Sequence, residues 1–207
     1  PAGAHALTES WDGTNWTEVA DLNTARQYLP NNGIQTAALC VGGAPAASNG
    51  RLNESWDGTS WTEITETTTG RYGMAGAGVQ TDALVFGGKT QPNATQVLTE
   101  KWDGSTWTEV ADLNNARGNI SGCGTTSAAL AYGGAGPAPV DVPNLQTEQW
   151  DGTSWTSVAN MANAAYGRSN IGTSTAALAG GGTPVSPTTA TEEWTDPTYA
   201  IKTVTTS

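Results

Sequence analysis

The chain repeats itself at a nearly constant interval, and this periodicity restricts the folds that it can adopt. The tripeptide Trp-Asp-Gly begins at Trp11, Trp56, Trp102 and Trp150, and a degenerate copy begins at Trp194, so the periods are 45, 46, 48 and 44 residues. Most leucine-rich, ankyrin and tetratricopeptide repeats are shorter than this. No segment has apolar residues at helical spacing, and Thr, Val, Trp and Gly dominate every copy. The sequence therefore predicts an all-β chain.

Each period contains four short segments with the composition of strands. Thr-Glu-x-Trp and Trp-Thr-x-Val flank a four-residue turn, as in residues 8–19, and this pattern indicates a β-hairpin. A glycine-containing segment and an alanine-rich segment ending in Gly-Gly, as in residues 33–43, form a second hairpin. Small side chains suit positions near a crowded axis, whereas tryptophans can fill wider outer spaces. We therefore predict a β-propeller of four-stranded antiparallel blades.

The tryptophans are expected to separate neighbouring blades. Residues that flank a four-residue turn face each other across the hairpin, so Trp11 should lie opposite Trp16. The same pairing is predicted for Trp56 and Trp61, Trp102 and Trp107, and Trp150 and Trp155, while Trp194 is followed by Tyr199 at the same spacing. Each buried aromatic ring removes about 150 to 250 Å² from water. The nine tryptophans are therefore assigned structural roles.

The number of blades remains open between four and five. Residues 1–207 are read as one domain with four complete blade repeats and an extra outer hairpin. Our preferred arrangement lets the hairpin at residues 7–20 close the ring beside inner strands around residues 172–182, which leaves 191–207 as a degenerate hairpin or exit segment. The alternative is a five-bladed ring completed by residues before Pro1 or by another subunit.

A second set of residues recurs with the repeat and carries charge. Glu54, Glu100 and Glu148 each precede a tryptophan by two residues, and Arg26, Arg71 and Arg117 recur in the connectors. A group that is present in every copy indicates a structural part rather than a single site. We predict that these carboxylates and guanidinium groups pair. Ala165 occupies the arginine position of the last repeat.

Composition argues against several classes of function. Eight basic and nineteen acidic residues give a net charge of −11, which disfavours binding to nucleic acid. The single histidine, His5, cannot build a histidine-rich metal centre or a Ser-His-Asp triad, and each Asp-Gly turn offers one carboxylate without a second acid at calcium-loop spacing. We expect no enzyme activity, no metal, no cofactor and no membrane insertion. Cys40 and Cys123 fall in separate repeats and are predicted to remain free thiols.

The repeat resembles a known family. A Gly-Gly doublet, a downstream Glu-x-Trp, a second Trp and the segment Val-Ala-Asp-Leu-Asn-x-Ala-Arg are similar to the kelch repeat, and the likeness covers nearly the whole chain. The near-identity of residues 56–62 and 150–156 is similar to kelch-like arrays in bacteriophage virion and tail-fibre proteins. These resemblances imply a β-propeller and a location in an extracellular virion.

The segments after the Gly-Gly doublets differ between repeats and are our candidates for recognition, because variable loops on a constant scaffold commonly carry binding. The candidate ligand-binding residues are Arg51, Lys89, Asn93, Asp141 and Asn144. We expect a non-enzymatic binding module of a phage virion, used in tail-fibre or host recognition, that presents these loops to a host-surface glycan or protein. The alternatives are a purely structural virion or filament assembly protein, which forms homo-oligomers or contacts other virion subunits, and an extracellular or cytosolic kelch adaptor.

Overall fold

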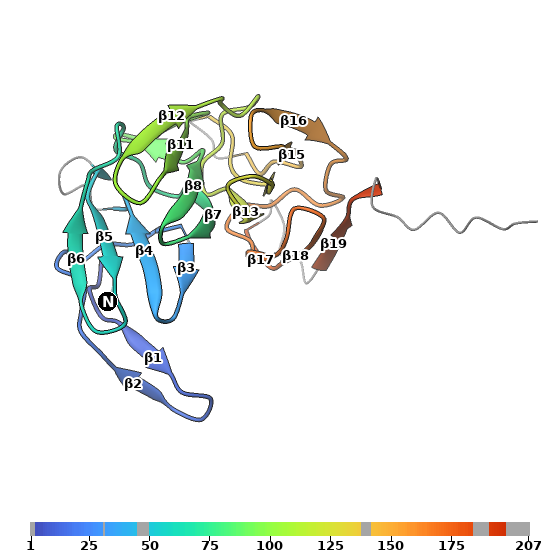
Figure 1. The fold of residues 1–207 in the computed structure, drawn as a ribbon. Coiled ribbons are helices and arrows are strands. Elements are labelled where there is room, and N and C mark those ends of the chain that lie inside the picture. Colours follow the sequence, from blue (N-terminus) through green and yellow to red (C-terminus); the bar gives the residue numbers. More distant parts are fainter. Residues whose placement is uncertain (1–2, 31, 45–49, 138–141, 184–190, 198–207) are drawn as a thin grey trace, which may run out of the picture.

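The chain is all-β and is built mainly from antiparallel four-stranded sheets (Figure 1). The structure is a computed structural model that describes residues 3–30, 32–44, 50–137, 142–183 and 191–197. An N-terminal hairpin is formed by β1 (Glu9–Trp11) and β2 (Trp16–Glu18). Four larger sheets, which we name A to D in chain order, follow it.

Within each sheet the strands follow one another in sequence, so that the first strand of the sheet is also its first edge. Sheet A consists of β3 (Asn32–Ile34), β4 (Ala37–Val41), β5 (Asn53–Trp56) and β6 (Trp61–Ile64). Sheet B consists of β7 (Ala75–Val79), β8 (Asp82–Phe86), β11 (Thr99–Trp102) and β12 (Trp107–Val110). Between β8 and β11 the chain forms a separate small hairpin of β9 (Lys89–Thr90) and β10 (Ala94–Thr95).

The last two sheets differ in strand number. Sheet C consists of β13 (Ser121–Gly124), β14 (Ala129–Tyr132), β15 (Thr147–Trp150) and β16 (Trp155–Val158). Sheet D has three strands among the described residues, namely β17 (Ile171–Gly172), β18 (Ala176–Gly180) and β19 (Thr191–Thr195). Three complete four-stranded sheets are therefore present in the described part of the chain.

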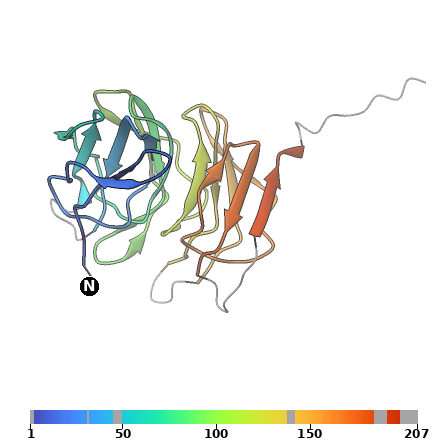
Figure 2. The ribbon, with the colours of Figure 1, turned by 90° about the horizontal axis from the view of Figure 1, so that it is seen from below.

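The sheets succeed one another along an arc (Figures 1 and 2). The first strands lie on the inside of this arc, where β3 contacts β7, β7 contacts β13, and β13 contacts β17. The N-terminal hairpin lies beside sheet A at one end of the arc, and sheet D forms the other end. This arrangement agrees with the expectation that small residues line the inner strands.

The preferred way of closing the ring is wrong. β19 pairs with β18 over five residues, from Ala176 opposite Thr195 to Gly180 opposite Thr191. Residues 191–195 are thus the third strand of sheet D and not an exit segment. They follow β18 in the chain, so they take the position beside it that we had assigned to residues 7–20. β1 and β2 pair with each other and form a sheet of their own.

The hydrophobic core lies between successive sheets. Leu39 of sheet A packs in one cluster with Trp102 and Trp107 of sheet B. Leu84 of sheet B packs in the next cluster with Trp150 and Trp155 of sheet C. A third cluster joins Leu130 of sheet C to Trp194 of sheet D. The tryptophans therefore separate neighbouring sheets, as the repeat predicted.

The predicted tryptophan pairs are confirmed at all four described hairpins. The partners lie opposite each other in the strand register, and their ring centroids are 5.5 Å apart in β1–β2, 5.3 Å in sheet A, 5.2 Å in sheet B and 5.4 Å in sheet C. Burial differs sharply between the copies. Trp155 is 5% exposed, whereas Trp11 and Trp16 are 43% and 64% exposed. Trp11 and Trp16 therefore pair with each other but do not separate two sheets, because no preceding sheet covers them in the described structure. Tyr199 lies outside the described residues.

The predicted pairing of arginine and glutamate is also confirmed. The distance between the guanidinium and carboxylate groups is 2.8 Å for Arg26 and Glu54, 2.6 Å for Arg71 and Glu100, and 2.8 Å for Arg117 and Glu148. These side chains are almost fully buried. Burial lowers the pKa of the Arg71 and Arg117 guanidinium groups, while the adjacent glutamates oppose this shift. Each carboxylate also accepts hydrogen bonds from a connector, as Glu100 does from the backbone N–H and hydroxyl of Thr68.

Each arginine also fastens the two ends of a variable segment. Nη1 of Arg71 donates to the carbonyl oxygens of Gly87 and Leu98, at distances of 2.7 and 2.6 Å. The same nitrogen of Arg26 donates to Gly42 and Leu52, and that of Arg117 donates to Gly133 and Gln146. One guanidinium thus holds together the points where the chain leaves and re-enters the sheet.

In the fourth repeat the arginine comes from another position. Ala165 stands where the other repeats have arginine, but Arg168, three residues further on, reaches Glu192 at 3.2 Å. Glu192 also accepts hydrogen bonds from the backbone N–H groups of Ala162 and Asn163. The connector keeps the ion pair although the spacing has changed, so the sequence departure at Ala165 does not remove it.

The Gly-Gly doublets allow the backbones of adjacent repeats to approach closely. Gly42 and Gly43 have positive φ angles of 62° and 106°. A Cβ atom on Gly42 would come within 2.4 Å of the carbonyl oxygen of Arg71, which accepts a hydrogen bond from the N–H of Gly43. A larger residue at this position would therefore separate sheet A from the connector to sheet B.

The aspartates of the Trp-Asp-Gly motifs close the hairpin turns. Oδ1 of Asp57 accepts hydrogen bonds from the backbone N–H groups of Thr59 and Ser60, both at 2.8 Å, and from the Thr59 hydroxyl. Asp12, Asp103 and Asp151 make the corresponding backbone contacts. These carboxylates therefore have a structural role in the turns.

The lowered pKa values of the turn aspartates predict that the protein loses stability in acid. Hydrogen bonds from Thr59 and Ser60 lower the pKa of Asp57 to about 2, and those from Ser154 and Thr153 lower the pKa of Asp151 to about 2. An unfolded aspartate has a pKa of about 3.9. The folded state therefore favours the charged form, so the stabilisation is complete above pH ~4 and disappears between about pH 4 and 2. We expect the thermal midpoint of the Asp57→Asn, Asp151→Asn double variant to fall less steeply than that of the wild type in this interval. Equal slopes would contradict the assignment.

Candidate functional site

Four of the five loop residues proposed for ligand binding are described by the structure, and the two cations among them are not available as free charges. Lys89 is only 2% exposed, so its ammonium group is not presented at the surface. The prediction overlooked that β9 begins at Lys89 and pairs by a β-bridge with Tyr72 in the connector to sheet B. Arg51 is partly exposed, but it lies 3.3 Å from Glu66 and donates to the carbonyl oxygen of Thr67. Two of the proposed cations are therefore engaged within the chain.

The remaining candidates are polar groups at the same end of the sheets. Asn93 accepts a hydrogen bond of 2.7 Å from the hydroxyl of Tyr72. Asn144 is partly exposed and accepts a hydrogen bond from the backbone N–H of Gln146. Asp141 lies outside the described residues. The ring of Tyr72 in turn lies beside that of Tyr28, with 6.3 Å between the ring centroids. Tyr28 belongs to a cleft that the sequence did not predict.

Tyr28 lines an open cleft of about 510 Å³ at the end of the sheets where the connectors meet the first strands. Its walls come from four consecutive repeats. The lining residues are Tyr28, Leu29, Gly73, Met74, Asn119, Ile120, Ser121, Tyr166, Gly167, Arg168, Asn170 and Thr183. Its lining residues stand at or just before the first strands, which contact one another on the inside of the arc, so we call it the axial cleft. Its volume lies within the range of sites for small ligands, which is about 300 to 1,000 Å³.

Backbone hydrogen bonds join the segments that line this axial cleft. The N–H of Gly73 donates to the carbonyl oxygen of Tyr28, that of Ile120 donates to Gly73, and that of Gly167 donates to Asn119. These bonds join the connectors of successive repeats directly. The cleft therefore has a continuous wall, even though its residues are far apart in the sequence.

Two non-glycine residues that line the cleft have a positive φ angle, which is uncommon for residues other than glycine. Positions 28, 73, 119 and 167 correspond to one another in the repeats, and their φ angles are 61°, 62°, 49° and 63°. Two of these residues are glycines, whereas Tyr28 and Asn119 are the non-glycine residues with positive φ in the described chain. A bulky residue in this region is strained. Such strain is concentrated at functional sites, so the Tyr28 ring is a candidate for ligand contact. The alternation of Tyr, Gly, Asn and Gly was the sequence signal available for this position.

The cleft offers an aromatic surface and neutral polar groups. The side chain of Tyr28 is 58% exposed, and Tyr166 lies partly exposed on the wall of sheet D. Amide groups come from Asn119 and Asn170, and the latter accepts a hydrogen bond of 3.3 Å from the N–H of Gly122. Among the described residues that line the cleft, Arg168 alone carries a formal charge, and Glu192 neutralises it. The site thus suits an uncharged polar ligand.

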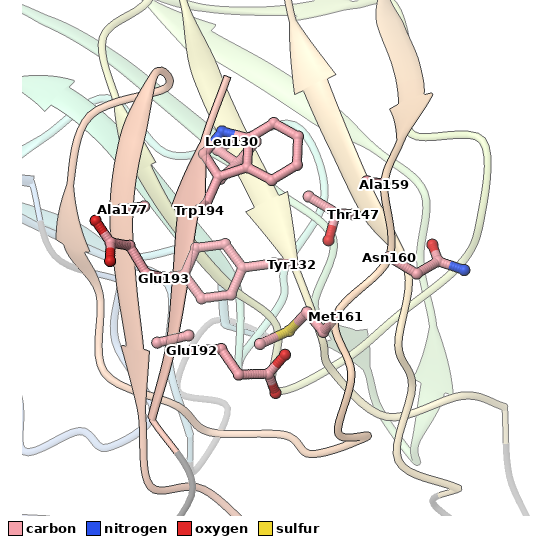
Figure 3. A pocket seen from close by; sticks show the side chains of 11 residues that line it. Leu130, Tyr132, Thr147, Ala159, Asn160, Met161, Ala177, Glu192, Glu193 and Trp194 are labelled. Atoms are coloured by element: carbon pink, nitrogen blue, oxygen red, sulfur yellow. The ribbon is translucent and has the colours of Figure 1, made fainter. Parts of the chain in front are cut away.

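A second, smaller cavity of about 70 Å³ lies between sheets C and D (Figure 3). The side chains of Tyr132, Met161 and Trp194 point toward it. Between sheets A and B and between sheets B and C the corresponding space holds two tryptophans, but here only Trp194 is described. The position that corresponds to Trp107 and Trp155 is Tyr199, which lies outside the described residues. This cavity is a part of the packing between sheets rather than a recognition site.

Other features of the described residues concern metals, membranes and thiols. No group of three or more His, Cys, Asp or Glu side chains comes together there as a metal site. The same residues contain no helix with the length and apolar character needed to cross a bilayer. Cys40 and Cys123 are free, as predicted, and burial raises the pKa of each thiol to about 11.

The comparisons with known proteins define the fold only. No protein-family model matches this chain, and no curated protein matches it. The solved structure described as "Structure of YjhT" is similar with a TM-score of 0.72 at 12% identity, over 86% of this chain and 68% of that one. At this identity the likeness concerns the fold. The chain is thus an all-β protein of consecutive antiparallel sheets that shares its architecture with that structure.

Proposed function

We propose that this chain is a kelch-like β-propeller module without enzymatic activity, and that it binds a neutral glycan in the axial cleft. Four sheets succeed one another with their first strands inside, which supports the propeller assignment. The observation that carries the binding proposal is the exposed, strained Tyr28 on the wall of a 510 Å³ cleft.

The chemistry of the cleft favours a neutral sugar over other ligands. A sugar presents C–H groups on its faces and hydroxyl groups at its edges. A tyrosine ring can pack against the former, while the side-chain amides of Asn119 and Asn170 can exchange hydrogen bonds with the latter. An acidic sugar would meet a protein of net charge −11 and a cleft whose one guanidinium is already paired. A neutral hexose or an oligosaccharide of such units is therefore the proposed ligand class.

The setting of this activity follows from the resemblance to phage arrays. We place the module in a virion, as a tail-fibre or host-recognition component that meets a host-surface glycan. The first described residues after the Gly-Gly doublets lie at the same end of the sheets as the cleft, because β-bridges join Gln27 to Ala44, Tyr72 to Lys89 and Tyr166 to Thr183. They would extend the contact beyond the sugar in the cleft.

Substitution of Tyr28 by glycine tests the proposal. The variant loses the ring but keeps the backbone conformation, which glycine adopts without strain. We expect affinity for neutral oligosaccharides, identified on a glycan array and measured by titration calorimetry, to fall at least about tenfold, which corresponds to ~1.4 kcal/mol. The thermal midpoint should not fall.

The control is Ile34→Ser, which changes another exposed apolar side chain that is not part of the cleft wall. Its glycan binding should equal that of the wild type. Glycan binding that survives Tyr28→Gly, or an array without a neutral glycan ligand, would refute the proposed site. A lower midpoint for Tyr28→Gly would instead assign the ring to stability.

A further inference from the structure

The two ends of the arc expose apolar side chains at positions that are more deeply buried in the other sheets. Leu39, Leu84 and Leu130 are at most 3% exposed, but Leu178 at the same position of sheet D is 44% exposed. Ile171 lies directly opposite Leu178 in the strand register and is 57% exposed. We name these two residues the leucine face. At the other end, Trp11 and Trp16 of the N-terminal hairpin form what we name the tryptophan face.

These two faces are the separated halves of an interface that the chain forms internally. In sheets A and B the leucine of one sheet packs against both tryptophans of the next sheet. The leucine face of sheet D presents the first half of this contact, and the N-terminal hairpin presents the second half. Within one copy the N-terminal hairpin and sheet D, which carry the two faces, lie at opposite ends of the arc (Figure 1).

The direction of the contact can be read from hydrogen bonds. The indole N–H of Trp155 in sheet C donates to the hydroxyl of Thr99 in sheet B, at 3.0 Å. The indole N–H of Trp61 in sheet A donates in the same way to Thr8, which precedes β1. The second tryptophan of these two hairpins therefore faces the preceding repeat, and Trp107 likewise packs with Leu39 of the preceding sheet. Trp16 must face a sheet that would come before the hairpin, and sheet D offers the leucine that such a sheet requires.

We propose that copies of this chain associate head to tail, with the tryptophan face of one copy on the leucine face of another. This inference goes beyond glycan binding and does not depend on it. The contact is heterologous, so repetition gives a closed ring or an open filament, depending on the angle between copies. The two faces are complementary in residue type, because a leucine and a tryptophan pair already pack together between sheets A and B and between sheets B and C.

Charge opposes this association and gives it a recognisable salt dependence. Each copy has a net charge of −11, and Glu9 and Glu18 lie opposite each other on the tryptophan hairpin. The leucine face has Glu193 opposite Leu178. Like charges at the edge of the contact repel each other over a Debye length of about 8 to 10 Å at physiological ionic strength. Association should therefore become stronger as salt is added.

A complementation experiment tests the direction as well as the existence of the contact. The tryptophan-face variant carries Trp11→Ser and Trp16→Ser, and the leucine-face variant carries Leu178→Glu. We expect the wild-type chain to form oligomers in analytical ultracentrifugation at micromolar concentration in 0.5 M salt, about three times physiological ionic strength. Each variant alone should be monomeric, because one of its two faces is lost. An equimolar mixture should yield a one-to-one dimer through the intact faces.

The controls keep the result decisive. All three substitutions replace exposed side chains, and thermal melts of the monomeric variants establish that they fold. Val79→Glu adds the same charge at an exposed apolar residue of sheet B, away from both ends, and should leave the oligomers unchanged. A wild-type chain that stays monomeric overturns the proposal, as does a mixture of folded variants without a dimer. Oligomers of either variant alone would show a contact of another kind and would overturn it too.

Discussion

Replacing Arg71 by methionine should lower the free energy of unfolding by about 3 to 5 kcal/mol. Both Arg71 and Glu100 are almost completely buried, and their charged groups are 2.6 Å apart. Without the guanidinium, the Glu100 carboxylate keeps its hydrogen bonds to Thr68 but stays buried without its cation. The carbonyl oxygens of Gly87 and Leu98 also lose the guanidinium donor, and that of Leu98 keeps only the backbone N–H of Gly87. Denaturant titration followed by tryptophan fluorescence measures the effect.

The matched control is Arg51→Met, which removes an arginine from an exposed ion pair. Arg51 and Glu66 are 3.3 Å apart, and their side chains are 43% and 38% exposed. An exposed pair of this kind contributes less than about 1 kcal/mol. The double variant Arg71→Met, Glu100→Gln should recover part of the loss, since the uncompensated buried charge is gone. If Arg71→Met is no more damaging than Arg51→Met, the buried pair is not part of the framework.

Replacing Trp155 by alanine should cost a similar amount, about 3 to 5 kcal/mol. Its ring lies between sheets B and C, 4.8 Å from the ring of Phe86 and 5.4 Å from that of Trp150. Removal of the indole leaves a cavity in the largest core cluster and deprives the Thr99 hydroxyl of its donor. For a chain of this length the thermal midpoint should fall on the order of 10 °C, which differential scanning calorimetry can measure.

Trp16→Ala is the control, because Trp16 holds the same place in its hairpin but is 64% exposed. In dilute solution its midpoint should stay within about 2 °C of the wild type, as is usual for exposed positions. Equal losses for the two variants would mean that the tryptophans stabilise each hairpin locally. The contact between sheets would then not be their main role.

The parts of the structure that repeat could be predicted from the sequence. Each repeat supplies independent evidence for the same local geometry, so the opposition of Trp56 and Trp61 followed from the turn length alone. The pairing of Arg26 with Glu54 followed from their joint recurrence. The pattern could not show that Arg168 replaces the missing arginine, because Arg168 lies three residues further along a connector of the same length and reaches the corresponding carboxylate from that different position.

Features that occur once were harder to predict. The prediction that residues 7–20 close the ring was wrong, because β19 follows β18 in the chain and takes the position beside β18. Lys89 looked like a loop residue, but the loop folds back into β9 and β10 and buries it. The axial cleft was missed because its residues are spread over four repeats and become neighbours only when the connectors meet. Tyr28 could have been found by comparing its position with Gly73 and Gly167.

The double hydrogen bond from each buried guanidinium has a consequence for evolution. Arg26, Arg71 and Arg117 hold the two ends of segments 43–51, 88–97 and 134–145, which differ in both length and composition. Because hydrogen bonds from the buried guanidinium fix both ends of each segment, residues can be inserted or deleted between these ends while the sheet stays in register. The scaffold can thus diversify its outer surface by accepting insertions at defined points, much as an immunoglobulin domain varies its hypervariable segments.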